Sequence, residues 1–210
     1  MVMFFAAQLA QARVMAIIRG TDSEAAVAAG RVLLEEGIRF VEVALTTPDA
    51  LTVIERLATT LPEGARLGAG TVLTAEEVVA VESAGAQFIV TPAVAPSLDV
   101  AVSRSLPAVV GALSPTEVIA ARARGASVVK LFPASLGGPA YLKALRDPFP
   151  DVPFLAVGGV DLAVAEQYLA IGAMGVGVGG PLVGDAASGG DLRALRARAQ
   201  GFVRLARPDL

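Results

Sequence analysis

Short runs rich in Val and Ile alternate along this chain with longer segments rich in Ala, Leu and charged residues, and this rhythm most constrains the fold. Within the short runs, apolar and polar residues do not alternate, which indicates strands buried on both faces, as in a parallel sheet. Eight strands are predicted: Val14–Ile18, Phe40–Leu45, Arg66–Gly68, Gln87–Val90, Ala108–Val110, Ser127–Leu131, Phe154–Val157 and Ala173–Val178.

The segments between the strands carry the start and stop signals of helices. Ser23, Thr74 and Asp161 are predicted N-caps, and Ser114 with Glu117 has the Ser-x-x-Glu spacing of a capping box. Four helices are predicted to end at a glycine, where a left-handed C-cap is expected: Gly37, Gly85, Gly125 and Gly172.

Eight strand–helix units predict an α/β protein with the (β/α)8 TIM-barrel fold, and an open doubly wound sheet is the alternative. The regular spacing and the eighth strand favour the barrel. No linker-like break in composition interrupts the chain, so residues 1–210 are predicted to form a single (β/α)8 barrel domain. The apolar start, MVMFFAAQLAQARV, is predicted to be a short amphipathic helix of a cytoplasmic protein. A signal peptide is the alternative, but no basic n-region precedes the apolar residues.

Composition argues against several classes of site and partner. The chain contains no His and no Cys, which excludes cysteine nucleophiles and disulfides and argues against a catalytic transition metal. The formal net charge is −3 and no basic run is present, so no nucleic-acid partner is predicted. The uncharged stretch Gln167–Gly184 contains six glycines and a proline, which suits a membrane span poorly, and no membrane partner is predicted.

Lys130 is the most informative residue near a strand end, because a barrel directs the carboxyl ends of all its strands at one active site. It lies inside the apolar run VVKLFP, whereas the second lysine, Lys143, lies in a helical segment. Burial lowers the pKa of a lysine, as a Schiff-base nucleophile requires. A buried ion pair, or a side chain that reaches solvent at the barrel rim, is the structural alternative.

Glu42 is a second charged residue within an apolar strand, in the run VEVAL. A carboxylate beside an imine-forming lysine can transfer protons to and from the substrate, so Glu42 is the predicted general acid/base. Alternatively, Glu42 only neutralises Arg19 or Lys130.

Paired glycines follow the last two strands, at Gly158–Gly159 and Gly179–Gly180. Their backbone N–H groups can approach a phosphate, which many barrels bind at this place; tight turns are the alternative reason for glycine there. The segment Gly175–Gly180 also satisfies the dinucleotide pattern GxGxxG. That interpretation is rejected, because no long helix follows directly and the motif lies at the last strand.

Taken together, the motifs at the strand ends resemble the 2-keto-3-deoxy-6-phosphogluconate (KDPG) aldolase family, bacterial class I aldolases that also act on 4-hydroxy-2-oxoglutarate. The similarity covers nearly the whole chain in the right order. It rests on Arg19, the strand of Glu42, GAGTV at Gly68–Val72, Thr91–Pro92, KLFP at Lys130–Pro133 and GGV at Gly158–Val160.

The resemblance implies a (β/α)8 barrel that assembles as a homotrimer and uses no metal or cofactor. It implies a Schiff base between Lys130 and C2 of pyruvate, with Glu42 as general acid/base. The substrate-binding residues it implies are Thr71 for the carboxylate and Arg19 for the carboxylate or another anionic group. It also implies Pro92 and Phe132 around the imine, and the backbone of Gly158, Gly159, Gly179 and Gly180 at the phosphate.

Four residues depart from the pattern of the better-known members. Thr46 replaces an arginine, Val157 a threonine, Pro181 a serine and Ser135 an acidic residue. Val157 and Pro181 remove polar donors from the region where the distal phosphate is expected. Losing a hydrogen bond to a charged group costs roughly 1.5–3 kcal/mol, so preference for a phosphorylated substrate is expected to fall about tenfold or more.

The sequence thus predicts a class I aldolase that cleaves a 2-keto-3-deoxy sugar acid. KDPG is the expected substrate, giving pyruvate and glyceraldehyde 3-phosphate, and 4-hydroxy-2-oxoglutarate is a further candidate. One alternative is a phosphosugar isomerase or synthase on a similar barrel, with Lys130 as a phosphate contact. Another is a non-catalytic sensor of a phosphorylated acid.

Overall fold

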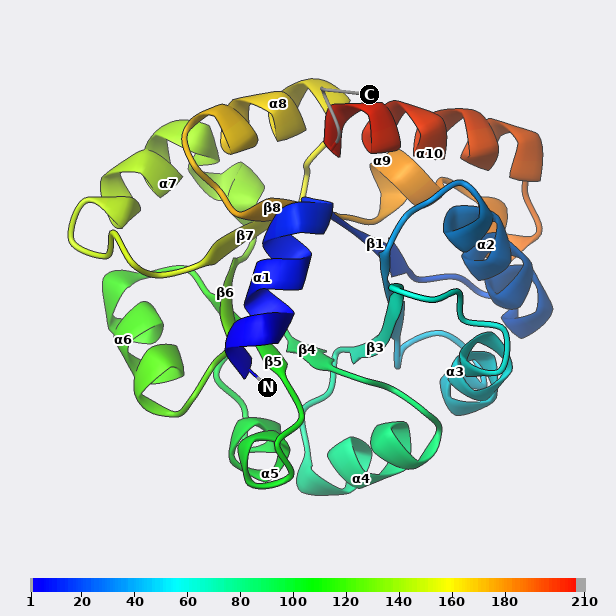
Figure 1. Ribbon diagram of the computed structural model, residues 1–210, viewed down its shortest axis with the longest axis horizontal. Coiled ribbons are helices and arrows are strands. Elements are labelled where there is room, and N and C mark those ends of the chain that lie inside the picture. The colour runs from blue at the N-terminus through cyan, green and yellow to red at the C-terminus, as the bar shows by residue number, and fades with distance from the viewer. Residues whose placement is uncertain (1, 207–210) are drawn as a thin grey trace.

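The computed structural model describes residues 2–206 and contains a closed parallel barrel in the strand order β1-β2-β3-β4-β5-β6-β7-β8 (Figure 1). The closed sheet confirms the TIM barrel and excludes the open doubly wound alternative. Strands β4, β6 and β8 begin later than predicted. The strands are β1 (Val14–Ile18), β2 (Phe40–Ala44), β3 (Arg66–Gly70), β4 (Ile89–Thr91), β5 (Ala108–Ala112), β6 (Val128–Leu131), β7 (Phe154–Val157) and β8 (Gly175–Val178).

Helices surround the barrel, because each strand is followed by a helical segment that packs on its outer face (Figure 1). The α-helices are α1 (Val2–Ala12), α2 (Ser23–Glu35), α3 (Ala50–Ala58), α4 (Ala75–Ser83), α5 (Ser97–Ser103), α6 (Pro115–Ala123), α7 (Gly138–Arg146), α8 (Leu162–Ala170), α9 (Gly180–Val183) and α10 (Leu192–Ala206). Two 3₁₀ turns are η1 (Ala134–Leu136) and η2 (Ala186–Ser188). No helix within residues 2–206 combines the length and the apolar character that a membrane span needs.

Most predicted helix caps are confirmed. Thr74 and Ser114 form complete capping boxes, and the Asp161 side chain accepts a hydrogen bond from Val164 N–H. The prediction for Ser23 is wrong, because Asp22 is the N-cap of α2 and accepts from Ala25 N–H at 2.8 Å. All four glycines predicted to end helices have positive φ, between 86° and 99°: Gly37, Gly85, Gly125 and Gly172.

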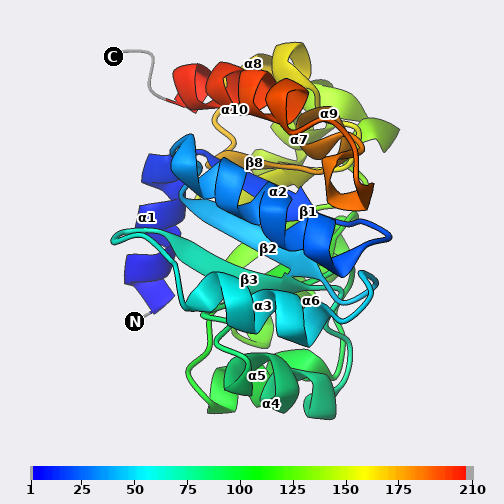
Figure 2. The same cartoon turned by 90° about the vertical axis from the view of Figure 1, so that its right-hand side faces the viewer.

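The predicted N-terminal helix is confirmed, and it closes one end of the barrel (Figure 2). Phe5 and Leu9 of α1 pack into the cluster that fills the barrel interior. The Phe5 ring lies 5.6 Å from that of Phe40 and 5.3 Å from that of Phe88, between ring centroids. Apolar side chains therefore fill the barrel interior at this end.

Strand register directs the two charged residues of the apolar strands into the barrel. Lys130 of β6 pairs with Gly111 of β5, and Glu42 of β2 pairs with Gly68 of β3. Residues two positions earlier, Val128 and Phe40, belong to the interior cluster. Because side chains alternate between the two faces of a strand, Lys130 and Glu42 also face the interior, nearer the carboxyl end.

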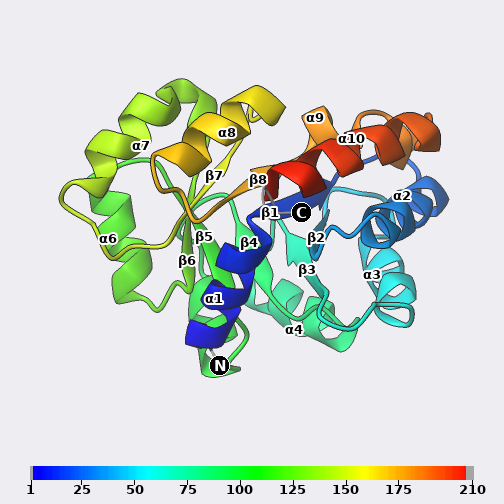
Figure 3. The same cartoon turned by 45° about the horizontal axis from the view of Figure 1, so that its top comes forward.

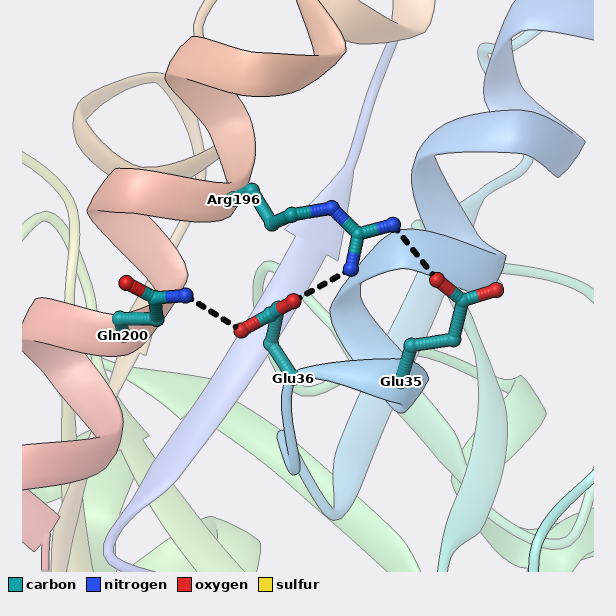
Figure 4. A network of polar contacts seen from close by, with 4 residues as sticks. All are labelled: Glu35, Glu36, Arg196 and Gln200. Atoms are coloured by element: carbon teal, nitrogen blue, oxygen red, sulfur yellow. Dashed lines mark hydrogen bonds and ion pairs between the residues drawn. The ribbon is translucent and has the colours of Figure 1, made fainter.

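The last helix is joined to the first unit of the barrel by a polar network between α10 and α2 (Figures 3 and 4). Arg196 contacts both Glu35, at 2.7 Å, and Glu36, and Gln200 donates to Glu36 at 2.9 Å. The Glu36 side chain is only 14% exposed. The network thus joins segments far apart in the sequence and helps to complete the ring of helices.

Replacing Arg196 by methionine is expected to lower the melting temperature by a few degrees at neutral pH. Hydrogen bonds from Gln200 and then from Arg196 hold the pKa of Glu36 below its ordinary value of 4.5. A lowered folded-state pKa contributes stability above the unfolded-state pKa and loses it as pH falls through the folded-state pKa. The difference in melting temperature between wild type and variant should therefore shrink below about pH 4.5. An unchanged difference at lower pH would contradict this.

Candidate active site

A cavity of about 200 Å³ opens at the carboxyl end of the strands. Every strand except β5 contributes to its lining, either directly or through the loop that follows the strand. All of the residues predicted for catalysis and substrate binding belong to this lining. They are Lys130, Glu42, Arg19, Thr71, Pro92, Phe132, Gly158, Gly159, Gly179 and Gly180. The remaining lining residues are Ile17, Val157, Val160, Gly177 and Pro181.

Lys130 is almost completely buried, with 7% of its surface exposed. Its Nζ lies 4.8 Å from the centroid of the Phe132 ring, which covers it on one side. Burial, the largest effect, lowers the pKa of Lys130 below its ordinary 10.5; the Arg19 charge lowers it further, and the Glu42 charge opposes both. This environment therefore increases the fraction of Lys130 side chains that carry the neutral amine, which is the nucleophilic form.

Glu42 is 1% exposed, and its Oε2 has no hydrogen-bond partner within the described protein. Burial raises the pKa of this carboxyl above its ordinary 4.5, although the charges of Lys130 and Arg19 act in the opposite direction. No ion pair within 4.0 Å joins Glu42 to either cation in the described part of the chain. A structural ion pair therefore does not explain these buried charges, and an unpartnered buried oxygen is typical of a functional site.

Gly70 is a site residue that the sequence analysis did not single out beyond its place in GAGTV. A Cβ atom at this position would overlap Oε1 of Glu42. The carboxyl group therefore depends on the absence of a side chain on the neighbouring strand β3.

Replacing Gly70 by alanine is expected to displace Glu42 and to lower kcat by about 10²-fold, the size typical of an ångström-scale misplacement of a reacting group. Gly201→Ala is the matched control, because a Cβ there would meet only Leu162 at an ordinary 3.6 Å. Steady-state cleavage rates of both variants test this. A Gly70→Ala enzyme with wild-type kcat would show that the position of Glu42 is not critical.

Thr71 follows β3 in the left-handed region, with φ of 62°, which is unusual for a β-branched residue. The backbone around it is held in place: Val72 N–H donates to Val90 O at 3.2 Å, and the buried Ser97 hydroxyl donates to Val72 O at 2.8 Å. Strain of this kind persists only where the surroundings enforce it, and it gathers at functional sites.

Arg19 lies across the mouth of the cavity from β1 towards the loops after β2 and β3. Its Nη1 donates to Thr46 Oγ1 at 2.5 Å, and its Nη2 donates to Thr71 Oγ1 at 3.3 Å. A guanidinium and a threonine hydroxyl therefore converge on one side of the cavity. This is the chemistry that binds a carboxylate.

The glycine pairs after β7 and β8 differ from one another. Gly158 and Gly159 have φ of 103° and 70°, and a Cβ on Gly159 would lie 2.7 Å from Ser135 Cβ. The turn conformation therefore requires glycine at these two positions, whether or not a ligand also approaches their backbone. No atom lies within 4 Å of the place where a Cβ on Gly180 would be, so the Gly180 backbone is accessible from the cavity.

Among the described residues, no three Asp or Glu side chains gather in a way that could hold a metal ion. The polar groups that do converge in the cavity are one amine, one carboxyl, one guanidinium and one hydroxyl, from Lys130, Glu42, Arg19 and Thr71. This set can form and break an imine on a keto acid and can bind its carboxylate.

A family model described as KDPG and KHG aldolase matches residues 5–197. The chain belongs to this aldolase family. Aldolases are lyases, so the protein is a lyase of the TIM-barrel class, and the resemblance found in the strand-end motifs is confirmed.

Known members of the aldolase family are similar over most of this chain. A probable 2-dehydro-3-deoxy-6-phosphogalactonate aldolase from Rhizobium meliloti is 38% identical over 85% of each chain. A solved structure described as "Native KDPGal structure" has a TM-score of 0.87 and 32% identity, covering 93% of this chain and 94% of the other. KDPG aldolase from Legionella pneumophila, solved with pyruvate captured as a covalent carbinolamine, has a TM-score of 0.81 and 30% identity, covering 97% and 96%.

Proposed function

We propose that this aldolase cleaves a 2-keto-3-deoxy-6-phospho sugar acid to pyruvate and glyceraldehyde 3-phosphate through a Schiff base on Lys130. The observation that carries the proposal is the pair of buried ionisable side chains, Lys130 and Glu42, which face one cavity without an ion pair between them. The covalent carbinolamine of pyruvate described for the Legionella relative supports the same chemistry here.

In the proposed reaction, the neutral Lys130 amine attacks C2 of the keto acid to form a carbinolamine. Protonated Glu42 then donates its proton to the carbinolamine hydroxyl, which leaves as water and gives an iminium ion and an ionised Glu42. Glu42 then takes the proton of the C4 hydroxyl while the C3–C4 bond breaks. The bond's electron pair passes into the iminium group, which becomes an enamine, and C4 leaves as the aldehyde. Glu42 returns a proton to C3. Water then adds to the pyruvate iminium, Glu42 takes up the proton that is released, and pyruvate leaves the neutral Lys130 amine.

The other lining residues suit the remaining parts of this substrate. Arg19 and Thr71 would bind the carboxylate next to C2, and Pro92 and Phe132 would enclose the imine. The accessible backbone at Gly180, with Gly179 and the Gly158–Gly159 turn, would face the distal phosphate. Because Val157 and Pro181 offer no side-chain donor there, the phosphate would depend on backbone N–H groups.

Two epimers of the substrate give the same products, and they differ at C4. The gluconate epimer, KDPG, is the first candidate, from the strand-end motifs. The galactonate epimer is the second, because the Rhizobium relative and the KDPGal structure are similar over at least 85% of this chain. 4-Hydroxy-2-oxoglutarate is a further candidate substrate. The homotrimer stays a prediction.

Pyruvate release from each epimer, measured with purified protein, tests the proposal. We expect cleavage of one or both epimers, with the unphosphorylated analogue cleaved more slowly. Faster cleavage of the galactonate epimer would assign the second candidate. No pyruvate from any of these acids would contradict the proposal and would favour a phosphosugar isomerase or a sensor.

A further inference from the structure

Arg19 has an ordered position that its own strand does not explain. The residue follows β1 and is exposed, and an exposed arginine side chain samples many rotamers in solution. Two hydroxyl groups from other loops nevertheless hold the two ends of the guanidinium: Thr46 Oγ1 accepts from Nη1 at 2.5 Å and Thr71 Oγ1 from Nη2 at 3.3 Å. The shorter of these contacts is to Thr46.

The loop that carries Thr46 is itself fixed to its neighbours. Leu45 N–H donates to Gly70 O at 2.8 Å, and Thr47 N–H donates to Ala44 O at 2.9 Å. The buried Thr47 hydroxyl accepts from Gly20 N–H at 3.4 Å. Thr46 is therefore an acceptor on a rigid support, tied to the loop after β1 and to β3.

Thr46 does not line the cavity, whereas Arg19 and Thr71 do. A guanidinium has five N–H donors, so hydrogen bonds to two threonines leave donors free for a ligand. Each threonine oxygen that accepts from Arg19 also keeps its own proton to donate. Thr46 thus acts from behind Arg19, and the free donors of Arg19 and Thr71 are presented together at the cavity.

We propose that Thr46 is a positioning residue, which holds the Arg19 guanidinium where it binds the carboxylate of the keto acid. This inference rests on the proposed function, because it takes a keto acid such as pyruvate as the ligand of the cavity. Thr46 lies outside the cavity lining, sets the affinity for the substrate through Arg19, and takes no part in bond cleavage.

Thr46→Val removes the acceptor and keeps the shape of the side chain, and Thr46→Ser keeps the acceptor. The probe is pyruvate, and the readout is the pyruvate concentration that gives half-maximal trapping of the protein by borohydride. Thr46→Val is expected to raise this concentration about tenfold, as for one lost hydrogen bond of a charged group. In Thr46→Ser this concentration should stay near the wild-type value. It should also do so in the control Thr52→Val, which changes an exposed residue of α3.

A double-mutant cycle separates positioning of Arg19 from a general effect on the loop. Once Arg19 is replaced by methionine, adding Thr46→Val should raise the half-maximal pyruvate concentration no further. An equal additional rise in the double variant would overturn the proposal, because Thr46 would then act independently of Arg19. Unchanged affinity for pyruvate in Thr46→Val would overturn the proposal as well. So would a loss of affinity in Thr46→Ser as large as that in Thr46→Val.

The wild-type protein distinguishes this proposal from the proposed function. If pyruvate is trapped on wild type and Thr46→Val behaves identically, only the positioning role fails. If wild type is not trapped at any pyruvate concentration, the Schiff-base function itself fails, and the role of Thr46 fails with it.

Discussion

Lys130→Ala is expected to abolish cleavage of the keto acid, because no other side chain in the cavity carries an amine. Without the imine, the electron pair of the breaking C3–C4 bond has no acceptor, so the loss should reach the detection limit of the assay. Lys130→Arg should be equally inactive, since a guanidinium stays protonated and cannot form the Schiff base. Pyruvate release from the phosphorylated acid is the measurement.

Lys143→Ala is the matched control, because the only other lysine of the chain lies exposed on α7. It should cleave the substrate at the wild-type rate. Circular dichroism and thermal melting of each variant separate a lost nucleophile from a lost fold. Retained turnover in a folded Lys130→Ala protein would exclude the imine mechanism.

Glu42→Gln is expected to lower kcat by about 10²–10⁴-fold, the range typical for loss of a general acid/base. The amide has nearly the shape of the carboxyl group, so it should fit beside Gly70 and leave pyruvate trapping partly intact. Parallel measurement of kcat and of trapping separates the two effects. A wild-type kcat in this variant would assign proton transfer to another group.

The pH dependence of cleavage gives a second test of Glu42. Burial raises the pKa of this carboxyl, and Glu42 must be ionised to accept the C4 proton. Activity should therefore fall as pH decreases through a value above the ordinary 4.5 of a glutamate, and that acidic limb should be absent from the residual activity of Glu42→Gln. An acidic limb of the same midpoint in both proteins would belong to a different group.

The barrel and its central charges were predictable because they depend on local patterns. Continuous apolar runs indicate strands buried on both faces, and a lysine or glutamate inside such a run stands out against them. Lys130 and Glu42 are accordingly found buried at the carboxyl end, with the other predicted site residues around the same cavity.

Features that depend on contacts between distant segments could not be predicted. The need for glycine at position 70 arises from the Glu42 carboxyl on the adjacent strand, and the role of Thr46 arises from a hydrogen bond to Arg19 on another loop. Local signals also failed where two candidates adjoin: Asp22, and not Ser23, caps α2. Helix α3 has no side-chain cap at all, since Asp49 before it is left-handed.

Intact-mass spectrometry after mixing the protein with pyruvate and borohydride tests the central claim most directly, with peptide mapping to locate the adduct. The account predicts one reduced pyruvate per chain, attached to Lys130, and an unmodified Lys143. A folded protein that gains no pyruvate, or that gains it on Lys143 alone, would contradict Schiff-base catalysis in this cavity.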